Sequence, residues 1–385
     1  MKKVLHISKY YYPFIGGIEK VARDMVNVLR EDDVEQKVIC FNENATDGSI
    51  KCYKEQTVYD EIDGVEIIRC GYKKKISSQS LSFAYYKELK KVMDNFSPDI
   101  VVFHYPNPYV AHILLKYKKR NFKLLLYWHL DITKQKILKK IFYRQTISLI
   151  DRASYVIGAT PIHIEQSEFS SKFEDKKRIL PYMINDENLL LTEEEEEKAK
   201  KLRDKYKNDK VCFFIGRHVE YKGLRYLVEA SENLLNKNIK ILIAGSGELT
   251  EELKRKACLD KKIEFLGRIN ESEKKIYMSM CDIFCFPSIT RNEAFGLALA
   301  EGMYYGKPAI TFSIPGSGVN YVNLNNITGI ECENSNAKDY ANAIDKLASD
   351  DKLRKILGEN AKKRIKDNFT SKKFKENVLE LFKEL

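Results

Sequence analysis

Short apolar runs alternate with amphipathic stretches along nearly the whole chain. Apolar and β-branched runs predict strands, in the first half at 3–8, 36–41, 65–69, 99–104, 123–129 and 154–159, and in the second half at 211–215, 240–244, 263–266, 283–286 and 308–312. Helical spacing of apolar residues predicts helices between them, including 17–29, 80–95, 133–150, 223–236 and 294–304. Because the strands are apolar on both faces, each sheet should be parallel and covered by helices on both sides. The pattern occurs twice, which predicts an α/β chain of two Rossmann-like, doubly wound domains facing across a cleft.

The length of the chain and one run of charged residues indicate how it divides into domains. At 385 residues it exceeds a single ordinary core, which suggests two domains. Five glutamates at 193–197 precede basic residues, a charge order that balances the dipole of an exposed helix near the domain junction. We therefore expect an N-terminal domain at 1–190, a C-terminal domain at 191–365, and a helical segment at 366–385 that packs back towards the N-terminal domain.

The net charge of +11 is concentrated in the first half of the chain. Residues 73–152 hold 17 basic and 5 acidic side chains, with basic runs at 73–75, 117–120 and 134–145. Such a surface suits anionic lipid headgroups, a phosphorylated acceptor or nucleic acid, and the alternative is a solvated lysine-rich surface. Nucleic acid ranks last, because no motif interleaves basic and aromatic residues at an informative spacing. We expect no nucleic-acid partner.

Other features place the chain in a reducing compartment. The eight cysteines show no metal-ligand spacing, and several lie in apolar strand runs, so we interpret them as buried thiols. The start, MKKVLHISKYYYPF, has too short an apolar stretch for a signal peptide and instead predicts a first strand. No run approaches the ~20 apolar residues of a spanning helix. We expect a cytoplasmic protein, at most peripheral on the inner face of the plasma membrane.

Two glycine turns follow predicted strands and open predicted helices. KYYYPFIGGIEK places Gly16 and Gly17 in this position, and KILIAGSGELTEEL places Gly245 and Gly247 there in the second half. Glycines in such turns let backbone N–H groups approach a phosphate or sugar, and the helix N-terminus adds positive potential. Steric need alone also explains glycine in these turns, so they gain weight only beside other motifs.

The second half also begins with two cations at the end of a strand. KVCFFIGRHVEYKGLRYL places Arg217 just past the strand and Lys222 at the mouth of the next helix. This pair can hold a diphosphate and neutralise charge that develops on a leaving group, whereas the alternative is a solvated surface pair. Further on, FLGRIN lies where a nucleobase fits against backbone groups of Arg268 and Ile269.

The stretch RNEAFGLALAE carries two glutamates eight positions apart. We expect a helix from near Ala294, with Gly296 permitting close approach of a pyrophosphate to the amides of Ala294, Phe295, Gly296 and Leu297. Carboxylates accept hydrogen bonds from hydroxyls, so Glu293 on a hexose and Glu301 on a ribose would flank that anion at ~10 Å. This arrangement fits a sugar nucleotide. The alternative is one capping and one exposed glutamate.

In this order after an N-terminal Gly-Gly loop, GRHVEYKG, AGSG and EAFGLALAE resemble the retaining GT-B glycosyltransferases of family 4. The resemblance covers nearly the whole chain. It implies that Glu293 contacts the donor sugar, Glu301 the ribose, and Arg217 and Lys222 the diphosphate. It also implies that Gly17 lies at the donor phosphate or on the acceptor side.

The same resemblance implicates a histidine in LLLYWHLD. His129 ends a strand of the first domain, and in the family such a histidine lies near the C6 hydroxyl of the donor sugar or the reaction centre. The neighbouring Asp131 is a candidate to orient it. His104 and His6 are weaker candidates, His6 as a buried strand residue. No Asp-x-Asp pair occurs in the chain, so we expect Arg217 and Lys222 to replace a metal on the diphosphate.

The resemblance therefore implies a retaining hexosyltransferase, and we expect it to need neither a metal nor a cofactor. It would move a hexose from a UDP- or GDP-sugar to a hydroxyl of a glycan or lipid-linked acceptor in cell-surface polysaccharide biosynthesis. The C-terminal domain would bind the donor and the N-terminal domain the acceptor, with His129, Glu293, Arg217 and Lys222 as catalytic residues. A GT-B-fold epimerase or phosphorylase would use the same contacts and remains an alternative. A non-catalytic polyanion-binding protein would need no donor pocket.

Overall fold

The computed structural model describes residues 2–14, 16–30, 32, 34–43, 55–76, 79–119, 121–131, 136–291 and 293–385, with the backbone alone at 136–141. It contains two compact units. The first is Met1–Pro181 together with Phe374–Leu385, and the second is Tyr182–Lys373. The first unit thus ends before the expected residue 190, and the second continues past the expected residue 365.

The first unit is built on an eight-stranded sheet in the order β10-β9-β8-β7-β1-β2-β4-β3. Its strands run parallel, except that the edge strand β3 is antiparallel to β4. A separate antiparallel hairpin joins β5 to β6. The bounds are β1 Lys2–Ile7, β2 Val34–Phe41, β3 Val58–Ile62, β4 Val65–Cys70, β5 Lys74–Ile76, β6 Gln79–Leu81, β7 Ile100–Tyr105, β8 Lys123–Trp128, β9 Tyr155–Gly158 and β10 Lys177–Ile179.

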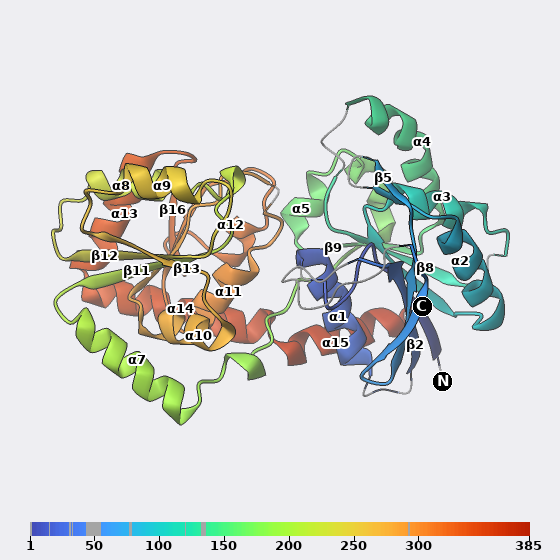
Figure 1. Ribbon diagram of the computed structural model, residues 1–385, viewed down its shortest axis with the longest axis horizontal. Helices are drawn as coiled ribbons and strands as arrows, with labels where there is room; N and C mark the ends of the chain where they lie inside the picture. Colours follow the sequence, from blue (N-terminus) through green and yellow to red (C-terminus); the bar gives the residue numbers. More distant parts are fainter. Residues whose placement is uncertain are drawn as a thin grey trace. The chain divides into compact units, whose positions relative to one another are not determined.

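Helices cover both faces of this sheet (Figure 1). On one face, α1 buries Ala22 and Val26 against β2 and β4. On the other face, α2, α3 and α4 pack over a larger apolar cluster that includes Leu5, Ile7 and Trp128. The bounds are α1 Gly17–Leu29, α2 Phe83–Asn95, α3 Pro108–Lys116, α4 Lys136–Arg152, α5 Pro161–Glu165, α6 Ser170–Phe173 and α15 Ser371–Lys383, with a 3₁₀ turn at Glu174–Lys176.

The second unit has a six-stranded, wholly parallel sheet in the order β13-β12-β11-β14-β15-β16. Figure 1 shows α8, α9 and α13 along one face and α10 and α14 along the other. The strands are β11 Lys210–Ile215, β12 Ile239–Ala244, β13 Ile263–Gly267, β14 Ile283–Phe286, β15 Ala309–Phe312 and β16 Gly329–Cys332. The helices are α7 Glu193–Lys205, α8 Leu224–Glu232, α9 Thr250–Lys256, α10 Glu271–Met280, α11 Leu297–Tyr304, α12 Val319–Val322, α13 Ala337–Ser349 and α14 Asp351–Asn368, with 3₁₀ turns at Glu187–Leu189 and Glu220–Lys222. Two parallel-sheet units are therefore confirmed.

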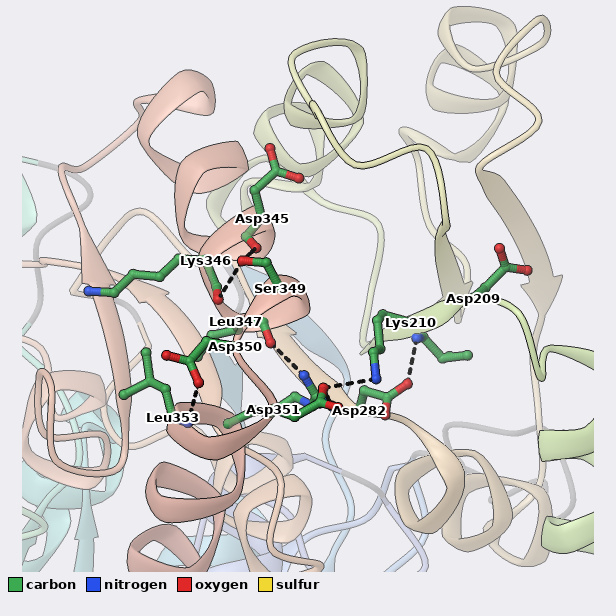
Figure 2. Close-up of polar contacts among 12 residues, drawn as sticks. Asp209, Lys210, Asp282, Asp345, Lys346, Leu347, Ser349, Asp350, Asp351 and Leu353 are labelled. Carbon is green, nitrogen blue, oxygen red and sulfur yellow. Dashed lines mark hydrogen bonds and ion pairs between the residues drawn. The ribbon is translucent and has the colours of Figure 1, made fainter.

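A polar network fastens the amino end of β11, opposite to the loops at its carboxyl end. Lys210, the first residue of β11, pairs with Asp351 at 3.0 Å, and the amide of Val211 donates to Asp282 at 2.8 Å (Figure 2). Asp350 caps α14 by accepting from the amide of Leu353 at 2.8 Å. The network joins β11 to the α13–α14 junction and so anchors the strand that leads to Arg217.

Several local expectations can be compared with the structure. The glutamate run begins α7, where Thr192 and Glu195 form a reciprocal capping box. Six cysteines are buried free thiols, Cys258 is exposed, and Cys52 lies outside the described residues. The basic run at 134–145 also lies partly outside them, because 134–135 are not described and 136–141 are described without side chains.

Candidate functional site

The carboxyl ends of four neighbouring strands carry most of the residues singled out in the second unit. The sheet order β13-β12-β11-β14 brings the loops after these strands side by side. In that order they carry Arg268, then Gly245 and Gly247, then Arg217 and Lys222, and finally Glu293. Neighbouring strands lie about 4.8 Å apart, so the row spans about 14 Å. Ligands of open parallel sheets bind at this edge.

One end of this row is hollowed into a cavity of about 510 Å³. The expected residues Gly245, Gly247 and Arg268 line it, and Arg268 Nε donates to the Ser246 hydroxyl at 2.7 Å. The full lining is His218, Gly245, Ser246, Gly247, Thr250, Glu251, Lys254, Phe265, Gly267 and Arg268. The lining combines the rings of His218 and Phe265 with glycines and several polar or charged groups.

The two glycines of the β12–α9 turn are required by close backbone packing. Gly245 has φ +114°, and a Cβ there would lie 1.9 Å from the carbonyl oxygen of Gly216. A Cβ at Gly247 would lie 2.4 Å from the carbonyl oxygen of His218. The β11 and β12 loops therefore touch through their backbones, which forms the wall of the cavity. Steric need accounts for both glycines, and it is the same packing that shapes the site.

Lys222 and Glu293 meet directly at the β14 end of the row. The Lys222 ammonium donates to Glu293 Oε2, and the side chains are only 12% and 14% exposed. Lys222 also lies over the Phe286 ring, 5.0 Å from its centroid. The Ser317 hydroxyl donates to the main-chain carbonyl of Glu293, which fixes the loop. A carboxylate held in this way presents an oriented acceptor for sugar hydroxyls beside a cation.

Arg217 lies closer to solvent than its partner cation. Its side chain is exposed, and Nη2 donates to the Tyr221 hydroxyl at 3.0 Å. The Tyr221 ring also contacts Lys222, whose ammonium lies 5.4 Å from the ring centroid. The Tyr221 ring thus contacts both cations at the end of β11. Sequence reasoning missed Tyr221, because a tyrosine between two helix-start residues carries no signal of its own.

Glu301 is not a solvated surface residue. Lys274 of α10 pairs with it at 3.1 Å, and both side chains are 13% exposed. Burial works against the charge of Lys274, but Glu301 and Glu271 together raise the pKa of this ammonium. The pair joins α10 to α11 and aims the Glu301 carboxylate. Lys274 was not identified from the sequence, because its stretch, ESEKKIYMSM, has only the pattern of an ordinary amphipathic helix.

The start of α11 differs from the sequence expectation. The helix begins at Leu297 rather than near Ala294, because Gly296 has φ +88° and acts as its N-cap in the left-handed region. Phe295 is buried and packs on Tyr182 and Phe369, with ring centroids 5.4 and 5.3 Å away. The side chain of Phe295 therefore belongs to the core, while Ala294 and Leu297 are half-buried. The amides at this helix end remain placed to face an anion.

In the first unit, His129 directly follows β8 and is buried. Burial, with a smaller contribution from His163, lowers its pKa to about 3, so the ring is neutral at physiological pH. Its Nε2 lies 2.9 Å from Nδ1 of His104, a residue of β7. Asp131, the expected orienting group, instead accepts from Trp128 Nε1 at 2.9 Å and from Ser167 at 2.7 Å. The partner of His129 at Nε2 is therefore a second histidine.

Gly16 and Gly17 form the turn that opens α1, as expected. Gly17 is the first helical residue, and Gly16 is an N-cap without a side-chain hydrogen bond. A Cβ at Gly16 would lie 2.2 Å from Glu19 Oε2, so this carboxylate covers the turn. Burial raises the pKa of Glu19, which its own backbone N–H and Lys9 partly oppose. A carboxylate at this place favours a hydroxyl ligand over a phosphate.

Basic side chains of the first unit gather along α2 and α3. A groove of about 430 Å³, here called the α2–α3 groove, is lined by Tyr86, Leu89, Lys90, Asp94, Ile113, Lys116, Tyr117, Lys118 and Lys119. Lys119 pairs with Asp94 at 2.8 Å, which leaves the groove with a net positive charge. Searched over the described part of the chain, no helix is long and apolar enough to cross a bilayer. The same residues contain no cluster of three or more metal-ligating side chains.

Two family models match the chain, one in each half. Residues 15–166 match a model described as Glycosyltransferase Family 4, and residues 194–364 match one described as Glycosyl transferases group 1. Together they contain the Gly-Gly turn, His129, and the glycines, cations and glutamates of the second unit. Ile269 and Arg268 also fall within the second match.

Similar proteins extend over nearly the full length. The O-antigen chain mannosyltransferase C of Escherichia coli is 25% identical over 96% of this chain and 95% of its own length. The D-rhamnosyltransferase WbpZ of Pseudomonas aeruginosa is 25% identical over 96% of this chain and 92% of its own. Among solved structures, Anabaena HepE in complex with UDP-glucose has a TM-score of 0.73 and 18% identity, and covers 100% of both chains. WaaG, a glycosyltransferase involved in lipopolysaccharide biosynthesis, has a TM-score of 0.66 and 15% identity over 95% of both chains. These structures show the same GT-B fold.

Proposed function

The chain belongs to the family 4 glycosyltransferases of the GT-B fold, and on that premise we propose that it transfers a hexose from a nucleoside-diphosphate sugar to a hydroxyl of a glycan or lipid-linked acceptor. Family 4 members are typically retaining, so the product would keep the anomeric configuration of the donor. The two relatives with O-antigen or rhamnosyl names support a role in cell-surface polysaccharide biosynthesis.

The row of loops at the carboxyl edge of the second sheet carries this proposal. A base would occupy the cavity against Arg268; Ile269, the next residue, is half-buried and is not among the residues that line the cavity. The diphosphate would meet the end of α11 and the cations Arg217 and Lys222. Glu293 would then hold hydroxyls of the hexose, and Glu301 those of the ribose. The row of about 14 Å suits an extended nucleotide sugar. HepE is described in complex with UDP and with UDP-glucose, which favours a donor of this class.

The charge of each of these residues would determine its role in the reaction. Arg217 and Lys222 would stabilise the negative charge that develops on the departing diphosphate, the role that a metal ion has in other sugar transferases. Lys222 is held against Glu293 in the described structure, so donor binding would place the diphosphate beside a cation that is already oriented. His129, neutral and buried, would donate or accept one hydrogen bond at the hexose. The oxygen of the leaving phosphate would take the proton of the incoming hydroxyl on the same face.

Calorimetric titration with UDP-, GDP-, ADP- and dTDP-sugars in EDTA tests the donor site. We expect one nucleotide to bind with a Kd in the micromolar range and the chelator to leave that affinity unchanged. Binding by none of the donors, or binding that EDTA abolishes, would contradict a metal-free donor site. Turnover without any acceptor hydroxyl, or only with free phosphate, would instead indicate an epimerase or a phosphorylase.

For the acceptor, the first unit supplies the supporting observations. The turn at Gly16 and Gly17 lies under the Glu19 carboxylate and favours hydroxyl groups. The α2–α3 groove combines lysines with tyrosine rings, which suits the anionic headgroups of a membrane on which a lipid-linked acceptor would be held. We therefore place the protein on the inner membrane face as a peripheral enzyme.

A further inference from the structure

One face of the first sheet carries a row of buried polar side chains. Residues of β1 alternate, so that Leu5 and Ile7 enter the apolar cluster under α2 while His6 and Ser8 point to the opposite, α1 face. The β1–β7 register, continued one residue past the pair Ile7 and Phe103, places Ser8 beside His104. In turn, β7 pairs His104 with Tyr127 of β8, two residues before His129. The row, here called the polar row, is made of His6, Ser8, His104, Tyr127 and His129.

The contact between His104 and His129 is a hydrogen bond of good geometry. Nδ1 of His104 and Nε2 of His129 are 2.9 Å apart, and the two ring planes differ by only 4° with centroids 5.2 Å apart. Both residues are 1% exposed. Burial lowers the pKa of each ring, that of His104 with further contributions from His129 and His6. Two neutral imidazoles share one proton in such a bond, so the bond ties the tautomer of one ring to that of the other.

Three side-chain atoms of the polar row lack the hydrogen bonds that would offset their burial. Within the described part of the chain, no hydrogen-bond partner lies within reach of His6 Nδ1, Ser8 Oγ or His104 Nε2. A buried polar atom without a partner destabilises the fold, and an apolar residue of similar shape would avoid that cost. Within the described residues, the side chain of His104 makes one hydrogen bond, to His129. The hydrogen bond of His104 therefore fixes the orientation of the His129 ring.

We propose that His104 is a positioning residue that holds His129 in one ring orientation and one tautomer, so that Nδ1 of His129 always has the same hydrogen-bonding role. This inference rests on the proposed function, because it assigns His129 to the sugar-transfer site. His104 does not touch the substrate in this account and acts only through His129. Tyr127 supports the arrangement by stacking on both rings, with centroids 5.6 Å from His104 and 4.6 Å from His129.

Two substitutions separate positioning from a structural role. His104→Phe keeps a ring of similar size but removes the hydrogen bond, and His104→Asn keeps a polar group near the place of Nδ1. We expect His104→Phe to change the melting temperature little, because it removes one buried nitrogen that has no partner, His104 Nε2, but also removes the partner of another, His129 Nε2. A merely structural role for His104 predicts instead a clearly lower melting temperature in His104→Phe.

The direct readout is the His129 ring in the full-length protein labelled with ¹⁵N-histidine, its signals identified by their loss in His129→Gln. Long-range ¹⁵N–¹H spectra should show a single neutral tautomer in wild type and in His104→Asn, and averaged nitrogen shifts in His104→Phe. Unchanged His129 shifts in His104→Phe would overturn the proposal. This measurement needs no substrate, so it decides the positioning role even where the proposed activity fails.

Kinetics supply the second readout, with the donor selected by calorimetry. We expect kcat to fall tenfold or more in His104→Phe and to return to within threefold of wild type in His104→Asn. Wild-type kcat in His104→Phe, or equal loss in both variants, would overturn the positioning role. Absence of turnover in wild type with every donor would count against the proposed function alone, and the spectra would still judge His104.

Discussion

At the residue scale, the second unit holds its two glutamates with two lysines from other parts of the chain. Lys222 meets Glu293 and Lys274 meets Glu301, and all four side chains are largely buried. A carboxylate fixed in this way loses little conformational entropy when it accepts hydroxyl groups of a ligand. The two pairs therefore hold both glutamates in fixed positions, as the proposed donor site requires.

Lys274 offers a matched pair of tests, because it also contacts Glu271 at 2.7 Å. The Glu271 side chain is 86% exposed and the Glu301 side chain 13%. We expect Glu301→Gln to weaken donor binding about tenfold, since a ribose contact loses its charge, which corresponds to about 1.4 kcal/mol. Glu271→Gln should change it less than twofold. Calorimetry on both variants decides, and equal effects would remove Glu301 from the ribose site.

A buried histidine should make the protein sensitive to acid. Burial lowers the pKa of His6 to about 4 although a hydrogen bond with Gln36 opposes this, whereas in the unfolded chain the pKa is about 6.5. Above pH 6.5 neither state binds a proton at His6. Between pH 6.5 and 4 only the unfolded state binds a proton there, so the free energy of unfolding falls by up to about 1.4 kcal/mol for each unit by which the pH decreases.

The measurement is urea unfolding at pH 7 and pH 5 for wild type and His6→Gln. The variant should lose about 2 kcal/mol less than wild type between the two values, because 1.5 pH units of linkage disappear. Equal losses in the two proteins would show that His6 is not neutral in the folded state.

At the element scale, the interior strands were predictable from the sequence, whereas the short strands and one helix start were not. The strand predicted at 283–286 matches β14, whose four apolar residues are all buried. By contrast β5, β10 and β16 are three or four residues long with mixed polarity, which gives no periodic signal. The start of α11 was misplaced because the sequence around Phe295 reads as helix, whereas packing of that ring sets Gly296 at positive φ.

The same limit applies to the site. Two dense local motifs contain the cations and glutamates of the site, Arg217 and Lys222 in the first and Glu293 and Glu301 in the second, so the sequence alone indicates them. Lys274, Tyr221 and the contact of His104 with His129 depend on elements that only the fold brings together. The expected role of Asp131 went wrong for this reason, since nearness in sequence was taken for nearness in space.

The β12–α9 turn gives an element-scale prediction. Gly245→Ala combines φ +114° with a Cβ that would overlap the Gly216 carbonyl, so the wall of the cavity must shift. We expect a loss of about 2–4 kcal/mol in stability and donor binding weakened at least tenfold. Gly306→Ala is the matched control, with φ +75° but no contact closer than 3.7 Å.

Because Gly306→Ala meets only backbone strain, it should cost about 1–2 kcal/mol and leave donor affinity within threefold. Thermal unfolding and calorimetry compare the two variants. Equal donor affinity in Gly245→Ala and Gly306→Ala would mean that the cavity at β11–β13 does not receive the donor.

At the scale of the whole molecule, charge and chemistry are divided between the two units. The excess of basic residues lies at 73–152 in the first unit, whereas the second unit carries the expected donor site. A division of this kind fits a protein that rests one unit on an anionic surface and handles a soluble nucleotide with the other.

Vesicle flotation tests this division. We expect wild type to float with vesicles containing anionic lipid at low salt, and the triple variant Lys116→Ala, Lys118→Ala, Lys119→Ala to bind several-fold less. The control removes three lysines of α7 instead, Lys198→Ala, Lys201→Ala and Lys205→Ala, and changes net charge equally. Equal loss of vesicle binding in both triple variants would mean that net charge alone causes the effect. Absence of binding by wild type would contradict a membrane-binding surface on the first unit.

The central claim is that a hexose leaves a nucleotide sugar at the second unit with retention and without a metal. ¹H NMR can follow the anomeric proton during donor cleavage in EDTA for wild type, Glu293→Ala and the control Glu331→Ala on β16. In Glu293→Ala, Lys222 still has its contact with the Phe286 ring. The first anomer formed should have the configuration of the donor. The cleavage rate should fall about 100-fold in Glu293→Ala, which corresponds to about 2.7 kcal/mol of activation free energy, and less than twofold in Glu331→Ala. An inverted first product, loss of turnover in EDTA, or wild-type rates in Glu293→Ala would contradict this mechanism.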